Sequence, residues 1–196
     1  MTRRYELKKR AEHREATRQR IVEAAIHLHG TVGPAATQVT DIADRAGVER
    51  ATVYRHFPDL ASLFEACTGH FLHMHPGPDI SAWSRIDDPE DRLRSALTAT
   101  YAYFEEHPQM FANILRDAEW LESLGSPPAF VEMETAMVQV LARGWRSRGK
   151  ARTRVLAALG LAMGFHTWRS LVHSGLDSEG AVELMVGVVA GVAGRN

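Results

Sequence analysis

A short stretch between positions 50 and 56 concentrates side chains that can hydrogen-bond to nucleic acid. Arg50 and Arg55 can each donate to a guanine in bidentate fashion or to a phosphate, and Thr52 offers a hydroxyl and a methyl that packs on thymine. Tyr54 and His56 add a phenol hydroxyl and a ring N–H. These donors point to DNA contact if one surface presents them together.

Two short helices joined by a tight turn are expected to form that surface. Before the turn, apolar residues recur at i, i+3, i+4 and i+7, which is typical of one face of a helix. That face consists of Val39, Ile42, Ala43 and Ala46. Gly47 then ends the helix, because glycine takes left-handed backbone angles without steric cost. The second helix turns Val53 and Phe57 inward. Its outward face consists of Arg50, Ala51, Thr52, Tyr54, Arg55 and His56. This is the arrangement of a helix-turn-helix.

The stretch from Thr37 to Phe57 resembles the DNA-binding signature of the TetR family of transcriptional regulators. The matching residues are Thr37, Val39, Ile42, Ala43, Ala46, Gly47, Val48, residues 51–57 and Leu63. The resemblance covers the first third of the chain. It implies an all-α fold, with a helix-turn-helix in an N-terminal three-helix DNA-binding domain (residues 1–58) and a C-terminal helical bundle for effector binding and dimerisation (residues 59–196).

The resemblance also assigns contacts on DNA. It implies that Tyr54 and His56 bind phosphate and that Thr40 touches the duplex, and we expect base readout mainly from Arg50. The predicted DNA-binding residues are Thr37, Thr40, Arg50, Ala51, Thr52, Tyr54, Arg55 and His56. For Arg55, a phosphate clamp or a surface ion pair remains an alternative.

Three positions depart from the usual family pattern. Gln38 replaces a Ser or Thr, so either Thr37 caps the first motif helix or that end is weakly capped. Glu49 replaces a Ser or Thr at the start of the second helix, where its charge suits the helix dipole but repels phosphate. Leu60 replaces a Lys that meets the DNA backbone. Together these changes predict either weaker electrostatic binding to DNA or more reliance on the basic N-terminal arm.

The basic residues are concentrated at the start of the chain. The net charge is −1, yet residues 1–20 hold eight Lys or Arg against three Glu, and residues 61–196 hold twelve basic against sixteen acidic residues. A basic head on an acidic body suits docking on phosphate from one side. We expect residues 1–13 to be disordered without DNA, either as a DNA-contacting arm or as a solubilising tail. A helix is predicted from Arg14 to about Thr31.

Composition restricts the other classes of protein. Cys67 is the only cysteine, which excludes an intrachain disulfide and fits a reducing compartment; it lies on an apolar stripe and is expected to be a buried core residue. The charged start holds no apolar secretion signal, and the apolar runs 155–165 and 184–194 are too short for a bilayer, so we expect a cytoplasmic protein, at the nucleoid when bound to DNA.

The remaining two thirds of the chain is rich in methionine and aromatic residues at helical spacing. Such side chains form ordinary core, and they are also the usual lining of an apolar cavity. By the resemblance, this region binds a small apolar or aromatic effector. The predicted pocket residues are Tyr101, Phe104, Phe111, Trp120, Met133, Met137, Phe165 and His166. A loop is predicted from Pro76 to Asp88, where Asp-Pro-Glu-Asp indicates the start of a helix that runs to His107. One helix is predicted over residues 151–174 and another from about 178 to the C-terminus.

Two glycine pairs in these last helices suggest a dimer interface. Gly160 and Gly164, and again Gly187 and Gly191, are four residues apart and lie on one helix face each. Small residues let helix backbones approach closely. We expect a homodimer through these helices, with tight packing inside one chain as the alternative.

No constellation typical of an enzyme is found. There is no Gly-rich phosphate loop, and the histidines His70, His73 and His75 lack cysteine or carboxylate partners in register, so we expect neither catalysis nor a metal or other cofactor. The sequence therefore predicts a repressor released from a palindromic operator by its effector. A helical-bundle enzyme or carrier, and a nonspecific nucleoid-type binder, are the alternatives.

Overall fold

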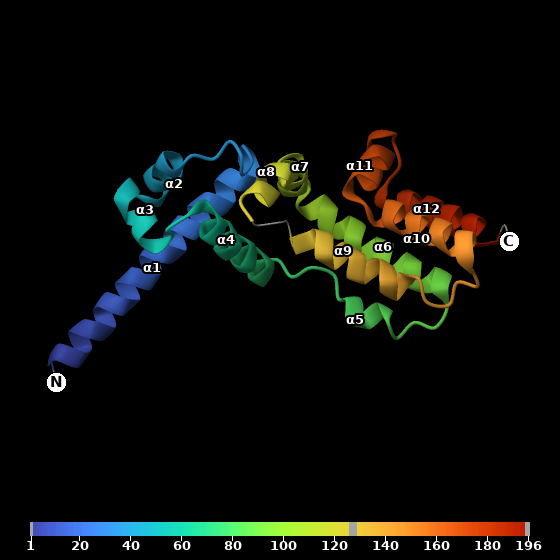
Figure 1. Ribbon diagram of the computed structural model, residues 1–196, viewed down its shortest axis with the longest axis horizontal. Helices are drawn as coiled ribbons and strands as arrows, with labels where there is room; N and C mark the ends of the chain where they lie inside the picture. Colours follow the sequence, from blue (N-terminus) through green and yellow to red (C-terminus); the bar gives the residue numbers. More distant parts are fainter. Residues whose placement is uncertain (1, 126–128, 195–196) are drawn as a thin grey trace. The chain divides into compact units, whose positions relative to one another are not determined.

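The computed structural model describes the backbone of residues 2–125 and 129–194, and the side chains of residues 5–125 and 133–194. This part of the chain is helical and contains no strand (Figure 1), which confirms the all-α prediction. It divides into two compact units. Unit 1 comprises Met1–Pro76 and Gln109–Pro128, and unit 2 comprises Gly77–Pro108 and Ala129–Asn196.

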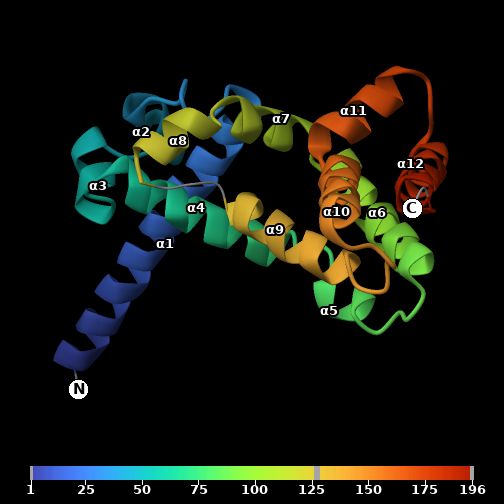
Figure 2. The same ribbon diagram turned by 45° about the vertical axis from the view of Figure 1, so that its right-hand side comes forward.

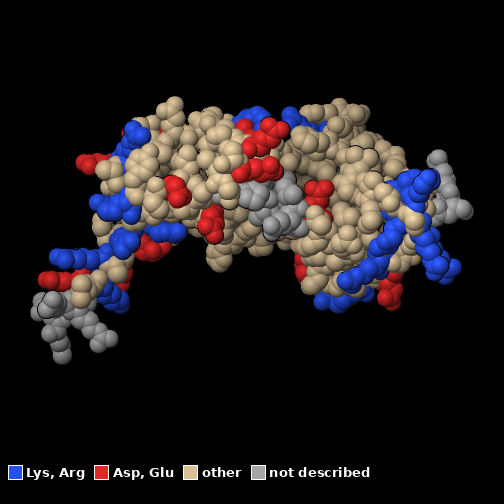
Figure 3. All heavy atoms as spheres, in the orientation of Figure 1, with Lys and Arg blue, Asp and Glu red and all other residues tan. Residues whose placement is uncertain are grey.

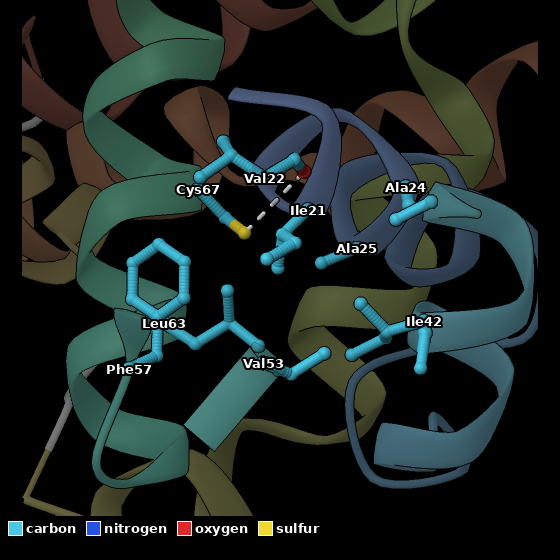
Figure 4. Close-up of a cluster of buried hydrophobic side chains, with 11 residues drawn as sticks. Ile21, Val22, Ala24, Ala25, Ile42, Val53, Phe57, Leu63 and Cys67 are labelled. Carbon is cyan, nitrogen blue, oxygen red and sulfur yellow. Dashed lines mark hydrogen bonds between the residues drawn. The ribbon is translucent and has the colours of Figure 1, made fainter. Parts of the chain in front are cut away.

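Unit 1 is built on a long first helix. Its helices are α1 (Thr2–Thr31), α2 (Val39–Ala46), α3 (Arg50–His56), α4 (Leu60–Met74), α7 (Pro108–Arg116) and α8 (Ala118–Ser123). The core between α1, α2, α3 and α4 is apolar (Figure 4). Its buried residues are Ile21, Val22, Ala24, Ala25, Ile42, Ala43, Ala46, Val53, Phe57, Leu63 and Cys67. This core fixes α2 and α3 against α1 and α4.

Cys67 is a buried core residue, as the apolar stripe predicted. Its thiol faces the carbonyl oxygen of Val22 at 3.7 Å. Burial raises the pKa of the Cys67 thiol to about 12, so the reactive thiolate does not form near neutral pH.

Helix α1 starts earlier than the sequence predicted. Residues 1–13 were expected to be disordered, whereas α1 is helical from Thr2 (Figure 2). From Tyr5 to Ala16 its side chains are exposed, so no tertiary packing explains the extension. The segment is composed of good helix formers, and Lys8 pairs with Glu12 one turn later at 3.8 Å. The helix propensity of these residues therefore explains why α1 extends beyond its packed part. The prediction of disorder underestimated this propensity.

The turn between α2 and α3 follows the predicted pattern. Gly47 has left-handed angles (φ 64°, ψ 45°), and the amide of Val48 donates to the carbonyl of Ala43 at 3.0 Å. Gln38 occupies the N-cap of α2 without a side-chain hydrogen bond. Thr37 is not the cap, because its hydroxyl donates to the carbonyl of Gly33 at 2.7 Å. The start of α2 is therefore weakly capped.

Helix α4 packs with α1 in unit 1. Asp59 caps it by accepting the amide of Ser62 at 2.7 Å. The contact-based units thus divide after Pro76 rather than at residue 58. The division predicted at residue 58 is one of function: DNA binding is assigned to residues 1–58, and effector binding and dimerisation to residues 59–196. That division stays a prediction.

Unit 2 is a bundle around α6. Its helices are α5 (Ile80–Trp83), α6 (Pro89–Glu106), α9 (Ala129–Leu141), α10 (Gly149–Met163), α11 (Phe165–His173) and α12 (Ser178–Gly194). Asp88 caps α6 by accepting the amides of Glu90 and Asp91 at 2.9 Å, as its Asp-Pro start predicted. Leu93, Leu97, Tyr101 and Phe104 form the buried stripe of α6, on which α10 and α12 pack.

Two boundaries in unit 2 differ from the prediction. The short helix α5 lies in a stretch expected to be a loop. The helix expected over residues 151–174 is broken at Gly164, where extended backbone (φ −72°, ψ 135°) separates α10 from α11 and the two helices bend by 62°. The break lets Phe165 and Trp168 enter the core beside α6. No individual helix in the described residues is long and apolar enough to cross a bilayer.

Candidate nucleic-acid interface

Helix α3 presents its donors on one exposed face. Arg50, Ala51, Tyr54 and Arg55 are exposed, and Thr52 and His56 are half-buried. The Arg50 Nη2 atom donates to the Tyr54 hydroxyl at 3.2 Å, and the guanidinium lies 5.5 Å from the centre of the tyrosine ring. Tyr54 therefore holds the side chain of Arg50 along the helix.

A second contact orders Arg55. Its Nη2 atom donates to the Thr52 hydroxyl at 3.2 Å. Neither Arg50 nor Arg55 has a carboxylate within ion-pair distance among the described residues, so the alternative of a surface ion pair for Arg55 finds no support there. Both guanidinium groups keep donors available for an anion.

Basic residues of α1 lie next to the end of α3. The guanidinium of Arg18 sits over the Phe57 ring, 4.9 Å from its centre. The pKa of His56 is lowered, first by partial burial and then by the positive charges of Arg14, Arg55 and Arg18. The α3 face thus continues into a basic surface along α1, where Lys and Arg side chains predominate (Figure 3).

Arg14 and Arg18 were not among the predicted DNA-binding residues. Their i, i+4 spacing places both residues on one face of the predicted first helix, and this was the feature of the sequence that could have identified them. Their position beside His56 and Phe57 depends on how α1 crosses α3. That crossing is tertiary, so the sequence alone did not connect them with α3.

The other predicted positions on this side lie in two environments. Thr40 is exposed in the first turn of α2. Thr37 is 9% exposed, and its hydroxyl is bonded to Gly33, so it supports the loop before α2. Glu49 is the exposed N-cap of α3 and makes no capping bond with its side chain. A carboxylate therefore stands at the start of α3, as the departure from the family pattern implied.

The predicted effector residues fall into two groups. Tyr101, Phe104, Met137 and Phe165 are buried in unit 2, where Met133 is half-buried and His166 is exposed. The rings of Phe104 and Phe165 meet edge to face at 5.3 Å. Phe111 and Trp120 belong instead to unit 1.

Trp120 lines a small pocket within unit 1. The other residues around it are His29, Pro34, Thr37, Ile42, Leu60, Leu63 and Phe64. Leu60, where the family pattern has a DNA-contacting Lys, is thus half-buried at this pocket. Its side chain contributes packing rather than charge.

Three of the four predicted interface glycines face open space within the chain. A Cβ built on Gly160, Gly187 or Gly191 would have no neighbour within 4 Å, whereas one on Gly164 would touch backbone of its own helix. Large apolar side chains are exposed on the same two helices, with Leu161 60%, Leu184 46% and Val188 40% exposed. Close packing inside one chain therefore does not account for these small residues.

The sequence of this chain resembles those of known regulatory proteins. Residues 21–67 match the family described as bacterial regulatory proteins, tetR family. The HTH-type transcriptional repressor Rv3405c of Mycobacterium tuberculosis is 28% identical over 186 residues, which cover 92% of this chain and 89% of that protein.

Solved structures share the fold. A TetR-like transcriptional regulator from Rhodococcus sp. RHA1 aligns with a TM-score of 0.62 at 17% identity, covering 91% of this chain and 97% of that one. NalD of Pseudomonas aeruginosa, described as the secondary repressor of the MexAB-OprM multidrug efflux pump, aligns with a TM-score of 0.58 at 22% identity, covering 91% and 96% of the two chains.

The family match runs from the second part of α1 through α2 and α3 into α4, so it includes the whole helix-turn-helix. Proteins of this kind are DNA-binding regulators and not enzymes. Residues 21–67 therefore form a DNA-binding domain of the TetR family of transcriptional regulators, and the chain as a whole shares the fold of TetR-like regulators.

Proposed function

We propose that the protein is a repressor that binds a palindromic operator as a homodimer and is released by a small apolar or aromatic effector. One observation supports DNA binding: Arg50 and Arg55 are exposed on α3 beside Arg14 and Arg18 of α1, and among the described residues they are bonded only to Tyr54 and Thr52. The name of the mycobacterial relative, a transcriptional repressor, supports repression as the output.

The side chains divide by role in this proposal. Phosphate contacts, which supply most of the affinity, are assigned to Tyr54, His56 and the basic residues of α1. Base readout is assigned to Arg50, with Ala51 and Thr52 available to pack on thymine methyl groups. Because Glu49 repels phosphate at the start of α3, the arginines of α1 become a necessary part of binding.

Dimerisation is assigned to the exposed faces of α10 and α12. A lone helix-turn-helix reads few bases, and a two-fold dimer doubles the number by reading two half-sites. The open space beside Gly160, Gly187 and Gly191 allows the partner's helices to approach closely. Leu161, Leu184 and Val188 then lose their contact with water.

Effector binding is assigned to the aromatic part of unit 2 around Tyr101, Phe104 and Phe165. Apolar walls with few polar groups suit a ligand of low polarity. The proposed place of action is the cytoplasm, at the nucleoid when the protein is bound to its operator.

Selection from a random DNA pool tests the proposal. The purified protein is incubated with duplexes carrying a randomised central region, and bound DNA is amplified over several rounds. The proposal expects a two-fold symmetric motif whose half-sites are about one helical turn, or a multiple, apart. Enrichment of no motif contradicts sequence-specific binding, and a motif with one half-site contradicts the dimer.

A further inference from the structure

The aromatic core of unit 2 contains two buried polar atoms without a hydrogen-bond partner. Thr100 is 5% exposed and Trp168 is 6% exposed. Neither the Thr100 Oγ1 atom nor the Trp168 Nε1 atom is bonded to any residue that the structure describes. Unsatisfied buried groups are costly, and native proteins keep few of them. Each one therefore calls for an explanation.

Trp168 belongs to a cluster of aromatic rings, and Thr100 lies next to a member of that cluster on α6. Thr100 lies one turn before Phe104 on α6, so both side chains leave the helix on the same face. The centre of the Phe104 ring lies 5.8 Å from that of Trp168 and 5.3 Å from that of Phe165. The hydroxyl of Thr100 does not use the carbonyl of Ala96, the usual partner of a helical threonine.

Some other buried polar groups of unit 2 do have partners, although the hydroxyl of Ser147 has none among the described residues. The Tyr101 hydroxyl donates to the carbonyl of Ala162 at 2.7 Å, and the Trp145 indole donates to the carbonyl of Leu141 at 3.0 Å. The fold is therefore able to satisfy a buried indole or hydroxyl in this unit. The unpaired Trp168 belongs to the cluster of aromatic rings, and the unpaired Thr100 lies one helical turn from Phe104 of that cluster.

The charges of unit 2 favour a neutral guest. Thr100, Tyr101, Phe104, Phe165 and Trp168 carry no charge. The buried guanidinium of Arg92 is occupied, since it donates to the carbonyls of Ile86, Asp87 and Arg143. Burial raises the pKa of the half-buried carboxyl group of Glu134 on α9, which disfavours its charged form. A charged ligand would be desolvated here without compensation.

We propose that Thr100 Oγ1 and Trp168 Nε1 are the polar points of a ligand site for a neutral aromatic molecule that carries a carbonyl oxygen, such as an aryl ketone or ester. A carbonyl oxygen has two lone pairs and accepts both the indole N–H and the hydroxyl. The aromatic part of the ligand packs edge to face against Phe104, Phe165 and Trp168. That this ligand is the effector rests on the proposed function; the binding site itself does not.

The first test compares thermal unfolding of ligand-free, full-length variants. Trp168→Phe and Trp145→Phe remove the same volume from a buried tryptophan, but only Trp145 loses a hydrogen bond. The melting temperature of Trp168→Phe should therefore exceed that of Trp145→Phe by about 2–4 °C. Thr100→Val should match or exceed the wild type. Thr17→Val, which loses the bond from a buried hydroxyl to the carbonyl of His13, should fall below it.

The second test measures binding of two matched probe pairs, acetophenone with ethylbenzene and 2-acetylnaphthalene with 2-ethylnaphthalene. The members of each pair differ in the carbonyl oxygen. The wild type should bind the ketone of at least one pair about tenfold more tightly than the hydrocarbon. Trp168→Phe should abolish this preference and Thr100→Val should weaken it severalfold, whereas Trp145→Phe should keep it.

Several results overturn the site. These are equal binding of ketone and hydrocarbon, binding of neither, an unchanged preference in Trp168→Phe, and tighter binding of benzyltrimethylammonium, which would instead favour a cation site near Glu134. DNA binding is measured separately on the same proteins. Operator binding without a ketone preference refutes the ligand site and leaves the proposed function supported. A ketone preference without DNA binding refutes the proposed function and leaves the ligand site supported.

Discussion

The carboxylate of Asp117 accepts a hydrogen bond from the backbone amide of Ala35, 3.0 Å away and 82 positions earlier in the chain. Two further bonds run in parallel: Arg116 donates to the carbonyl of Val32 at 2.8 Å, and Asn113 donates to the carbonyl of His29 at 2.9 Å. Together they tie α7 and the start of α8 to the end of α1 and the loop before α2. A displacement of α7 therefore reaches the helix-turn-helix through hydrogen bonds.

Removing the carboxylate should loosen this connection. Asp117→Ala leaves the amide of Ala35 without its acceptor and separates Arg116 from its partner, so we expect the free energy of unfolding to fall by about 1–3 kcal/mol in urea titrations. Asp117→Asn keeps an acceptor for Ala35 and should cost less. Glu119→Ala removes an exposed carboxylate of α8 and should change stability by less than about 0.5 kcal/mol. Equal losses at Asp117 and Glu119 would refute the role of the bond.

Gly33 is held in the same region by two constraints. Its φ of +98° disfavours any side chain, and a Cβ atom there would collide with Arg116 Nη2 and Asp117 Oδ2. Gly125 shares the positive φ (+73°) but has no neighbour near a built Cβ. We expect Gly125→Ala to cost about 1 kcal/mol and Gly33→Ala at least about twice that. Similar melting temperatures for the two variants would show that the side chains of Arg116 and Asp117 move away from position 33 at little cost.

His29 should make stability depend on pH. The side chain is 7% exposed; burial lowers its pKa from 6.5 to about 4, partly opposed by the charge of Asp117. The unfolded chain therefore binds a proton that the folded chain rejects, so stability is lost as pH falls from about 6.5 to 4. The loss reaches about 3 kcal/mol at pH 4.

The measurement is a set of urea titrations from pH 7 to pH 4 on the wild type and His29→Gln. Other titrating groups, such as His56, are common to both proteins and cancel in the comparison. The wild type should lose stability more steeply than the variant across this window. Parallel curves would mean that His29 is as easily protonated in the folded protein as in the unfolded one.

Gly191 tests the proposed dimer face. Gly191→Leu should weaken dimerisation at least tenfold, because the added side chain keeps the partner's helix at a distance, while each chain stays folded. Gly69→Leu on α4 is the matched control, since a Cβ there also has no neighbour within 4 Å. Analytical ultracentrifugation should find a dimer for the wild type and the control. A wild-type monomer at micromolar concentration would refute the interface.

The parts of the fold that could be predicted are those set by local chemistry. Val39, Ile42 and Ala46 mark one helix face, and Gly47 ends that helix because of its own backbone freedom; both features are readable within a few residues. The Asp88 cap was predictable for the same reason. The exposed donors of α3 followed directly from which side of that helix is apolar.

The parts that escaped prediction depend on distant contacts. The apolar pattern continues across Gly164, so the local sequence does not indicate that the helix breaks there. This break between α10 and α11 turns Phe165 and Trp168 toward α6. The bond between Asp117 and Ala35 joins residues 82 positions apart, and isolated polar residues leave no periodic signal. The length of α1 was missed for the opposite reason, because its charged composition was read as disorder although it favours helix.

The central claim is sequence-specific DNA recognition through α3, and an equilibrium titration tests it most directly. Fluorescence anisotropy is measured for the selected operator and for a scrambled duplex over a series of salt concentrations. We predict that the wild type binds the operator at least about a thousandfold more tightly than the scrambled duplex. Both affinities should fall steeply with salt.

In the same titration, Arg50→Ala should cost about 1–3 kcal/mol on the operator and relax the preference at one base position, while binding to scrambled DNA changes little. Equal losses on the two duplexes would reduce Arg50 to a backbone contact. A wild-type protein that binds operator and scrambled DNA equally, or binds neither, would contradict the account as a whole.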